Sequence, residues 1–204
     1  VYKRPPLLVM HDPLLDPLTL DRSSGRFVTA DYPLLTDDDL RRIADAFVAA
    51  AQLAWQIGFQ FVDIKQCHRY LLNELLAARL RGGEYGGAYE NRTRLARQII
   101  ARIRHEVPGL LVFTRLNVYD GVPYRVPPGR PQDPGEPWPV QKPVLSAWGT
   151  CPDDPLQPDL REPLRWIGEM QQLGVTVVNI SMGNPYASPH LTRPFEYPPP
   201  DGYE

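Results

Sequence analysis

The placement of proline is the feature that most restricts how this 204-residue chain can fold. Its 24 prolines crowd into segments 1–17, 123–158 and 185–200 and leave the stretches between them nearly proline-free. Proline lacks a backbone N–H donor and fixes φ, so these segments are expected to be loops. The stretch 118–158 is accordingly predicted to be irregular, and repeating secondary structure should fall outside the three segments.

Between the loops, short apolar runs alternate with stretches of helical periodicity. Strands are predicted at 7–11, 59–65, 110–117 and 175–181, and helices at 37–57, 70–80, 91–106 and 159–173. A strand–helix alternation with apolar strands is typical of a parallel sheet with right-handed crossovers. We therefore expect four parallel strands side by side. This pattern alone does not separate a barrel from a doubly wound sheet, but no Gly-x-Gly-x-x-Gly motif supports a dinucleotide fold.

N-terminal capping residues are predicted for three of the helices. Thr36, followed by three aspartates, is a good N-cap for the first long helix. Asn91 is predicted to cap the helix at 91–106. Asp159 and Glu162 match a variant of the capping box before the last helix.

Composition excludes several classes of partner. The formal net charge is −2, which gives no electrostatic basis for binding nucleic acid or an anionic membrane. No apolar run approaches the ~20 residues of a membrane span, and no signal peptide is visible. Cys67 and Cys151 lie far apart, so neither a cysteine metal motif nor a disulfide framework is predicted. We expect a cytoplasmic protein without a bound metal.

The most informative segment is the predicted strand at 59–65 together with the five residues after it. Strand alternation places Phe61, Asp63 and Lys65 on one face, and Lys65, His68 and Tyr70 then gather within six residues where the strand ends. In β/α barrels this end of the strands carries the active site. A cation, an imidazole and a phenol suit polarisation of a carbonyl and transfer of a proton.

Structural explanations compete with this functional one. Lys65 at a strand end is ordinarily a solvated charge, and Tyr70 at the start of a helix is ordinarily a packing residue. Arg115 on the next predicted strand could simply pair with Asp63, since a buried cation needs a partner. Cys67 is expected to be a small buried residue and not a nucleophile.

Two motifs at this spacing resemble the signature of the old yellow enzyme (NADH:flavin oxidoreductase) family. The first is Lys65-x-x-His68-x-Tyr70-Leu-Leu-Asn, and the second is Glu-Tyr-Gly-Gly-x-x-Glu-Asn-Arg at 84–92. Arg115 matches the family's arginine on the following strand. The resemblance implies an FMN-dependent NAD(P)H oxidoreductase of the ene-reductase type. Its substrate would be a small α,β-unsaturated carbonyl compound whose activated C=C bond is reduced.

The resemblance also implies a role for each matching residue. Tyr70 aligns with the tyrosine that protonates the substrate α-carbon, and Lys65 and His68 occupy the positions that hold the carbonyl oxygen. Arg115 aligns with the arginine beside the flavin pyrimidine edge. The family usually has histidine at the position of Lys65. A lysine donates as a flexible point charge and not as an aimed ring, so the substrate class stays open. The turn at 84–92 is taken as structural.

The implied fold is α/β, a partial (β/α)8 TIM barrel comprising about strands 4 to 7 with their helices. We expect residues 1–204 to form a single partial-barrel domain of a longer flavin oxidoreductase, inactive by itself, with homo-oligomerisation and an iron–sulfur branch left open. A barrel normally has eight strands and about 250 residues. The alternatives are a truncated, non-catalytic barrel fragment and a barrel lyase that uses Lys65 as a Schiff base.

Overall fold

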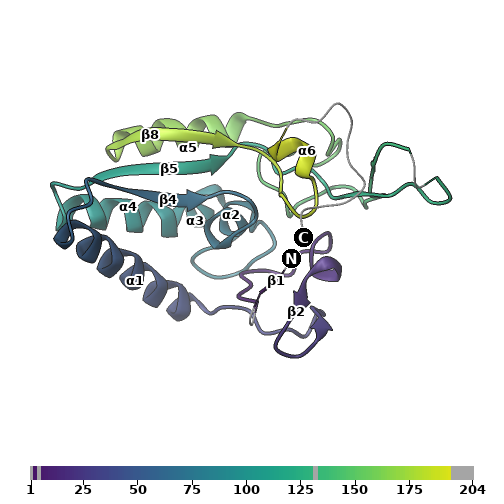
Figure 1. Ribbon diagram of the computed structural model, residues 1–204, viewed down its shortest axis with the longest axis horizontal. Helices are drawn as coiled ribbons and strands as arrows, with labels where there is room; N and C mark the ends of the chain where they lie inside the picture. The colour runs from purple at the N-terminus through teal and green to yellow at the C-terminus, as the bar shows by residue number, and fades with distance from the viewer. Residues whose placement is uncertain (1, 4–5, 131–132, 194–204) are drawn as a thin grey trace.

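A computed structural model describes residues 2–3, 6–130 and 133–193 of the protein. Its main sheet has three parallel strands in the order β4 (Phe61–Gln66), β5 (Leu111–Asn117) and β8 (Val175–Ser181). Figure 1 shows these strands running side by side with helices on one side of them. Three of the four predicted strands and their parallel pairing are therefore confirmed, as is the partial, unclosed α/β barrel.

Each predicted long helix is present, with shifted ends. The helices are α1 (Asp37–Gln56), α2 (Leu71–Ala77), α3 (Tyr89–Arg92), α4 (Arg94–Glu106), α5 (Arg161–Gln172) and α6 (Pro189–Thr192). None of the helices in the described part of the chain is long and apolar enough to cross a membrane. The segment predicted as one helix at 91–106 is split, because α3 ends at Arg92 and α4 begins after Thr93.

The predicted cap of α1 is confirmed. The Thr36 hydroxyl accepts a hydrogen bond from the Asp39 N–H at 3.1 Å, and the Asp39 carboxylate accepts one from the Thr36 N–H at 2.9 Å. The Thr36 hydroxyl also donates to this carboxylate, which lowers the pKa of Asp39 to about 2. This capping box satisfies N–H groups that the first turn of a helix leaves without partners.

The cap predicted at Asn91 is wrong, and the one predicted at Asp159 and Glu162 is only half formed. Asn91 lies inside α3, where its amide donates to the Gly86 carbonyl oxygen at 3.1 Å. Leu160 directly precedes α5 and has no capping side chain, but the Asp159 carboxylate accepts a hydrogen bond from the Arg161 N–H at 3.2 Å. Glu162 instead forms ion pairs with Arg79 and Arg92, and a carboxylate held by two arginines cannot fold back onto the helix backbone.

The predicted strand at 7–11 is also wrong. Leu8 makes a single isolated bridge to Leu34, although Leu8, Val9 and Met10 are all buried. The Leu8 carbonyl accepts from the Leu35 N–H at 2.8 Å, and the Val9 carbonyl accepts from Arg81 at 2.7 Å. A loop and an arginine thus satisfy carbonyls that a strand ladder would otherwise use, so the apolar run packs as irregular chain.

Short elements complete the chain. A small sheet joins β1 (Tyr2–Lys3), β2 (Leu20–Asp21) and β3 (Arg26–Phe27), with a 3-10 helix, η1, at Asp16–Leu18. Within 118–158, the described residues form only β6 (Tyr124–Arg125) and β7 (Glu136–Pro137), which pair antiparallel. The prediction of a largely irregular segment is therefore confirmed. Of the proline-rich segment 185–200, residues 194–200 lie outside the described chain.

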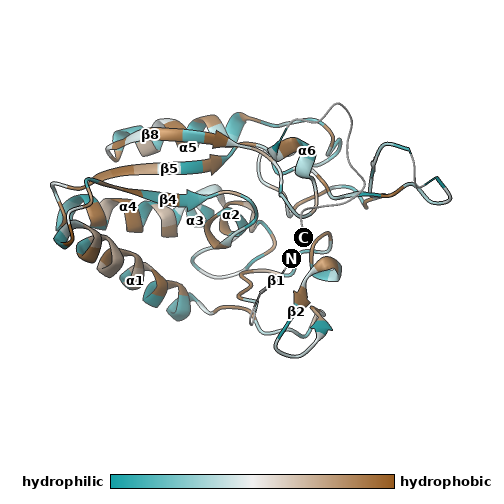
Figure 2. Ribbon diagram, viewed as in Figure 1, coloured by the Kyte–Doolittle hydropathy of each residue, from teal (hydrophilic) through white to brown (hydrophobic). Residues whose placement is uncertain are grey.

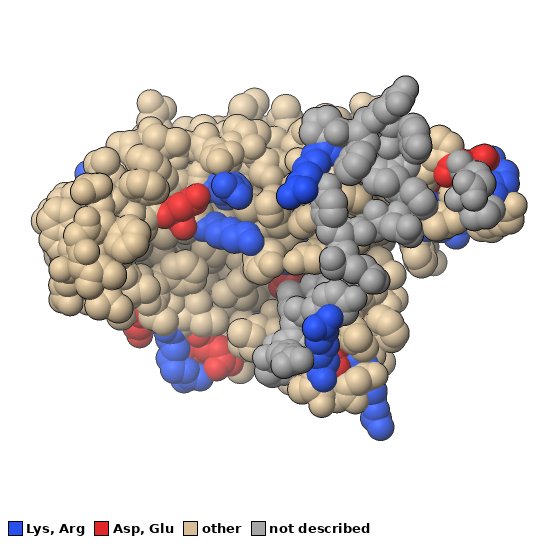
Figure 3. Space-filling view, in the orientation of Figure 1, with Lys and Arg blue, Asp and Glu red and all other residues tan. Residues whose placement is uncertain are grey.

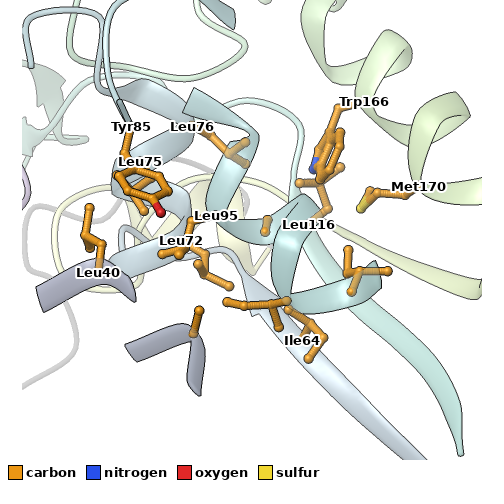
Figure 4. Packing of buried hydrophobic residues seen from close by; sticks show 14 of the residues in the cluster. Leu40, Ile64, Leu72, Leu75, Leu76, Tyr85, Leu95, Leu116, Trp166 and Met170 are labelled. Carbon is orange, nitrogen blue, oxygen red and sulfur yellow. The ribbon is translucent and has the colours of Figure 1, made fainter. Parts of the chain in front are cut away.

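The helices cover only one face of the main sheet. Alternate strand residues such as Ile64, Val112 and Leu116 pack there against side chains of α1, α2, α4 and α5 (Figure 4). Two buried polar side chains in this layer satisfy each other, since Gln66 donates to the Thr114 hydroxyl at 2.9 Å and accepts from the Trp166 indole at 3.0 Å. Burial of each large apolar side chain contributes roughly 1.5–3 kcal/mol, which fixes the strands on this side.

The opposite face of the sheet is open to solvent. Phe61 and Val177 are exposed on it, and the Phe61 and Phe113 rings stack with centroids 4.6 Å apart. Hydrophobic colour covers much of the strands, and hydrophilic colour increases toward the carboxyl ends of β4 and β5 (Figure 2). The space-filling view shows a small group of acidic and basic side chains near the middle of this surface, with further charged side chains along the lower edge and at the right-hand end (Figure 3). In a closed barrel this face would be the interior.

Replacing Thr36 with alanine should lower the free energy of unfolding by about 1 kcal/mol, because the first turn of α1 loses its capping hydroxyl. Thr36→Ser keeps the hydroxyl and is the matched control. Urea denaturation followed by circular dichroism measures both variants. A Thr36→Ala midpoint equal to that of the native protein would show that the capping box does not stabilise α1.

Candidate active site at the carboxyl ends of β4 and β5

The parallel register brings the predicted site residues to one end of the sheet. Lys65 of β4 lies opposite Arg115 of β5, and Arg115 lies opposite Asn179 of β8. His68 and Tyr70 follow in the turn between β4 and α2. Lys65 and Arg115 are exposed, Tyr70 is 42% exposed and His68 is half-buried. All four predicted residues therefore lie on the open side at the carboxyl ends of neighbouring strands.

The turn after β4 has an unusual backbone. His68 and Arg69 are consecutive non-glycine residues with positive φ, at 61° and 57°. Each costs on the order of 1–2 kcal/mol in this conformation, so surrounding contacts must hold the turn. The Arg69 N–H donates to the Asn73 side chain at 2.7 Å, and the Tyr70 N–H donates to the Cys67 carbonyl at 3.3 Å. This reversal allows His68 and Tyr70 to reach different neighbours.

Lys65 and Tyr70 are in direct contact. The Lys65 ammonium nitrogen lies 3.3 Å from the centroid of the Tyr70 ring, which is close enough for a cation–π interaction. Among the described residues no carboxylate forms an ion pair with Lys65, although Asp63 is two residues earlier on the same strand face. The contact therefore places a positive charge beside the phenol ring.

His68 contacts the last strand of the sheet. Its Nε2 lies 2.8 Å from the Ser181 hydroxyl at the end of β8. Burial lowers the pKa of His68, and the positive charges of Lys65 and Arg115 lower it further. The imidazole is therefore neutral at pH 7, with one nitrogen able to donate a hydrogen bond and the other able to accept one.

Tyr70 remains a protonated phenol at neutral pH. A hydrogen bond with the Tyr186 side chain raises the pKa of Tyr70, and burial raises it further. Tyr186 comes from the loop after β8, far from Tyr70 in sequence. A phenol that keeps its proton and has a hydroxyl neighbour is suited to donate that proton.

A cavity lies beside Tyr70. Its wall includes Leu8, Met10 and Leu15 from the N-terminal segment, and Tyr186 and His68 on the side of the sheet. Charged side chains, including Asp12, Arg69 and Glu74, also line it, whereas Lys65 and Arg115 do not. The cavity therefore reaches only the Tyr70 and His68 side of the candidate site. Among the described residues, no group of three or more histidine, cysteine, aspartate or glutamate side chains could hold a metal ion.

Arg115 presents a free guanidinium on the open face. No residue in the described ranges forms a hydrogen bond or ion pair with this side chain, so the alternative in which Arg115 simply pairs with Asp63 is not realised. An exposed, uncommitted guanidinium can donate in its plane to carbonyl oxygens of a flat ring.

Cys67 is buried between Gln66 and His68. Its burial raises the pKa of the thiol to about 11, and the charges of Lys65 and Arg115 only partly oppose this effect. A thiol that stays protonated is a poor nucleophile. The prediction that Cys67 is a packing residue agrees with this environment.

The glycine-rich turn at 84–92 has a structural role. Arg92 is buried and donates to the carbonyl oxygens of Gly87 and Leu76 and to Glu162. A side chain at Gly86 would collide with the Arg81 carbonyl oxygen. The turn therefore packs α2, α4 and α5 behind the site and places none of its side chains in the site.

Sequence reasoning reached part of this region and missed the rest. Strand alternation predicts that Asn179 and Ser181 share a face and line the site, and Ser181 does contact His68. Tyr186, in contrast, lies in a proline-rich loop where no periodicity marks it. Arg69 and Asp12 give no signal in sequence either, because each resembles an ordinary exposed charge.

Comparison with known proteins identifies the family. The NADH:flavin oxidoreductase / NADH oxidase family matches residues 12–125, which is more than half of the chain and includes Lys65, His68, Tyr70 and Arg115. The chain belongs to this family of flavin-dependent oxidoreductases, and the resemblance to the old yellow enzyme family is confirmed.

Individual relatives cover shorter parts. An NADH:flavin oxidoreductase of Gibberella zeae is 36% identical over 92 residues, which is 44% of this chain and 22% of the relative. An NADPH dehydrogenase of Clostridium acetobutylicum is 38% identical over 76 residues, 36% of this chain and 22% of the relative. The chain thus spans about a fifth of the length of the curated relatives it matches.

A solved structure shares the fold over most of the chain. Morphinone reductase in complex with tetrahydroNAD has a TM-score of 0.53 at 20% identity and covers 84% of this chain and 39% of its own. At this level of identity the likeness concerns the fold alone. It agrees with the partial barrel described above.

The His68 imidazole should titrate below the ordinary histidine pKa of about 6.5. The folded protein then binds this proton more weakly than the unfolded chain does, so His68 contributes a loss of stability as pH falls below about 6.5, and contributes none at pH 8. Lys65→Met should raise the His68 pKa, because one neighbouring cation is removed. NMR titration of the ring, assigned with His68→Gln, measures both. A His68 pKa above 6.5 in the native protein would contradict the described environment.

Proposed function

We propose that this chain carries part of the active site of an FMN-dependent NAD(P)H oxidoreductase that reduces the activated C=C bond of an α,β-unsaturated carbonyl compound. The observation that carries the proposal is the contact of a protonated tyrosine with a lysine at a strand end, beside a neutral histidine and opposite an uncommitted arginine in register. Family membership supports the flavin and the nicotinamide reductant.

FMN, when bound, would accept hydride from NAD(P)H and supply it to the β-carbon of the alkene. Arg115 would hold the edge of the flavin ring with its guanidinium, where a fixed positive charge favours the anionic form of the ring. Its position on β5, a central strand of the sheet, supports this role because both neighbouring strands restrain its backbone.

Lys65 and His68 would bind the carbonyl oxygen of the substrate. The Lys65 ammonium always donates, and a neutral His68 donates through one nitrogen. Negative charge grows on this oxygen as hydride reaches the β-carbon, so donors aimed at it stabilise the transition state more than the ground state. Because Lys65 lies against the Tyr70 ring, the oxygen and the proton donor would be held on the same side of the substrate.

Tyr70 would transfer its hydroxyl proton to the α-carbon. The C=C π bond then gains one hydride and one proton, and the phenolate recovers its proton from solvent. The raised pKa of Tyr70, caused by its Tyr186 neighbour and by burial, supports this role because the phenol carries its proton at neutral pH.

Tyr70→Phe in the protein that carries this chain should slow alkene reduction by roughly 10²–10⁴-fold, the usual loss for a positioned general acid. Flavin reduction by NAD(P)H should be nearly unchanged, because that half-reaction takes no proton from this group. Stopped-flow absorbance of the flavin measures the two half-reactions separately.

Tyr85→Phe is the matched control, since its hydroxyl is buried behind the site on Gln98, and both of its half-reactions should stay at the native rate. Equal slowing of both half-reactions in Tyr70→Phe would indicate a disturbed flavin site. Native rates in both would remove Tyr70 from the mechanism.

A further inference from the structure

Arg69 lies between His68 and Tyr70 in the turn after β4, yet its side chain is buried and points away from the open face of the sheet. Its side chain is only 6% exposed. The guanidinium forms ion pairs with Asp12 and with Asp120, the latter at 2.9 Å, and donates to the Ser146 carbonyl oxygen at 2.5 Å. Three of its contacts therefore come from segments distant in sequence.

The carboxylates around Arg69 are themselves held. Asp120 accepts from the Asn117 amide at 2.8 Å and from the Trp148 N–H at 2.8 Å. Asp12 accepts from the Ser146 hydroxyl at 2.8 Å. Both carboxylates are buried, so their charges require a cation in the same place. The network is centred on one guanidinium and ties the N-terminal segment to the loop after β5.

This network is well placed to hold the turn after β4. The Arg69 backbone has positive φ, as does that of His68, and neither residue favours this conformation intrinsically. The anchored side chain prevents the turn from relaxing to an ordinary one. Relaxation would rotate the residues on either side, which reach in different directions toward Ser181 and Tyr186.

We propose that Arg69 is a positioning residue: its buried ion pairs with Asp12 and Asp120 fix the left-handed turn that places Tyr70 and His68 at the end of β4. Arg69 borders the cavity beside Tyr70, but its guanidinium is engaged by the two carboxylates, so the role proposed for it is to hold the turn. The inference extends the proposed function, but its structural part is independent of whether Tyr70 is the proton donor.

The contact of Lys65 with the Tyr70 ring supplies a test at neutral pH. A ring current shields protons over its face, so the ε-methylene protons of Lys65 should resonate upfield in the full chain, and Tyr70→Leu gives the unshielded reference. Arg69→Lys keeps the charge but loses the planar fork. We expect it to abolish most of the upfield shift. Arg161→Lys, at an arginine whose side chain is 88% exposed, should leave the shift unchanged.

Asp12→Asn provides a second variant that keeps the shape and one acceptor oxygen for Leu14 and Ser146, but removes the charge and the acceptor that face Arg69. Asp12→Asn should reduce the upfield shift of the Lys65 protons by less than Arg69→Lys does. If Arg69→Lys does not fold, the shift in Asp12→Asn tests the proposal in its place. In the enzyme, Arg69→Lys should slow alkene reduction by ~10–100-fold, the scale of a small misplacement, and spare flavin reduction.

A folded Arg69→Lys protein with the native Lys65 shift would overturn the proposal, as would an unchanged shift in Asp12→Asn when Arg69→Lys is unfolded. A lost shift together with unchanged alkene reduction would support the positioning role and would contradict only the assignment of Tyr70 as the acid.

Discussion

The parallel pairing of β5 with both β4 and β8 is the constraint on which the site depends. Parallel strands end at the same edge of a sheet, so the register that sets Lys65 opposite Arg115 also gathers the turns that follow each strand. The helices pack one face of this sheet and fix the strands from behind. The other face carries the proposed site residues of the strands, since alternate side chains of the same strands must point there.

Different residues of the candidate site supply the fixed positive charge and the transferable proton. Lys65 and Arg115 supply positive charge that no described carboxylate neutralises through an ion pair, and this charge depresses the proton affinity of His68. Tyr70 keeps its proton through Tyr186 and burial. A site of this kind can stabilise an oxyanion and deliver a proton at neutral pH. Because the sheet is open on this side, the described residues form only one wall of such a site.

Local sequence patterns were sufficient for the long helices and the three strands of the main sheet, but not for the short elements or the long-range contacts. The period of apolar residues in α1 and the alternation in β4 follow from one-sided burial, and both were predicted. The run at 7–11 was misread because its carbonyls are satisfied by Leu35 and Arg81, whose positions depend on the whole fold. Glu162 was misread as a capping residue for the same reason, since Arg79 and Arg92 come from distant parts of the chain. Asn91 was misread because a nearby carbonyl, that of Gly86, takes its side chain.

The candidate site shows the same contrast between local patterns and long-range contacts. Lys65, His68, Tyr70 and Arg115 were found through the spacing of motifs along the chain, whereas the contacts that orient them come from residues brought close only by folding. Tyr186, which contacts Tyr70, comes from the loop after β8, more than a hundred residues later in the sequence. Asp12, which pairs with Arg69, comes from the N-terminal segment. No periodicity records such pairs, so residue types and spacing do not reveal them.

The central claim is that this strand-end cluster serves a flavin. Visible absorption of the purified protein that carries this chain, recorded before and after incubation with FMN, tests it most directly. The account predicts one FMN per protein, with weaker binding in an Arg115→Ala variant that keeps the native circular dichroism. A protein that stays colourless after incubation with FMN would contradict it.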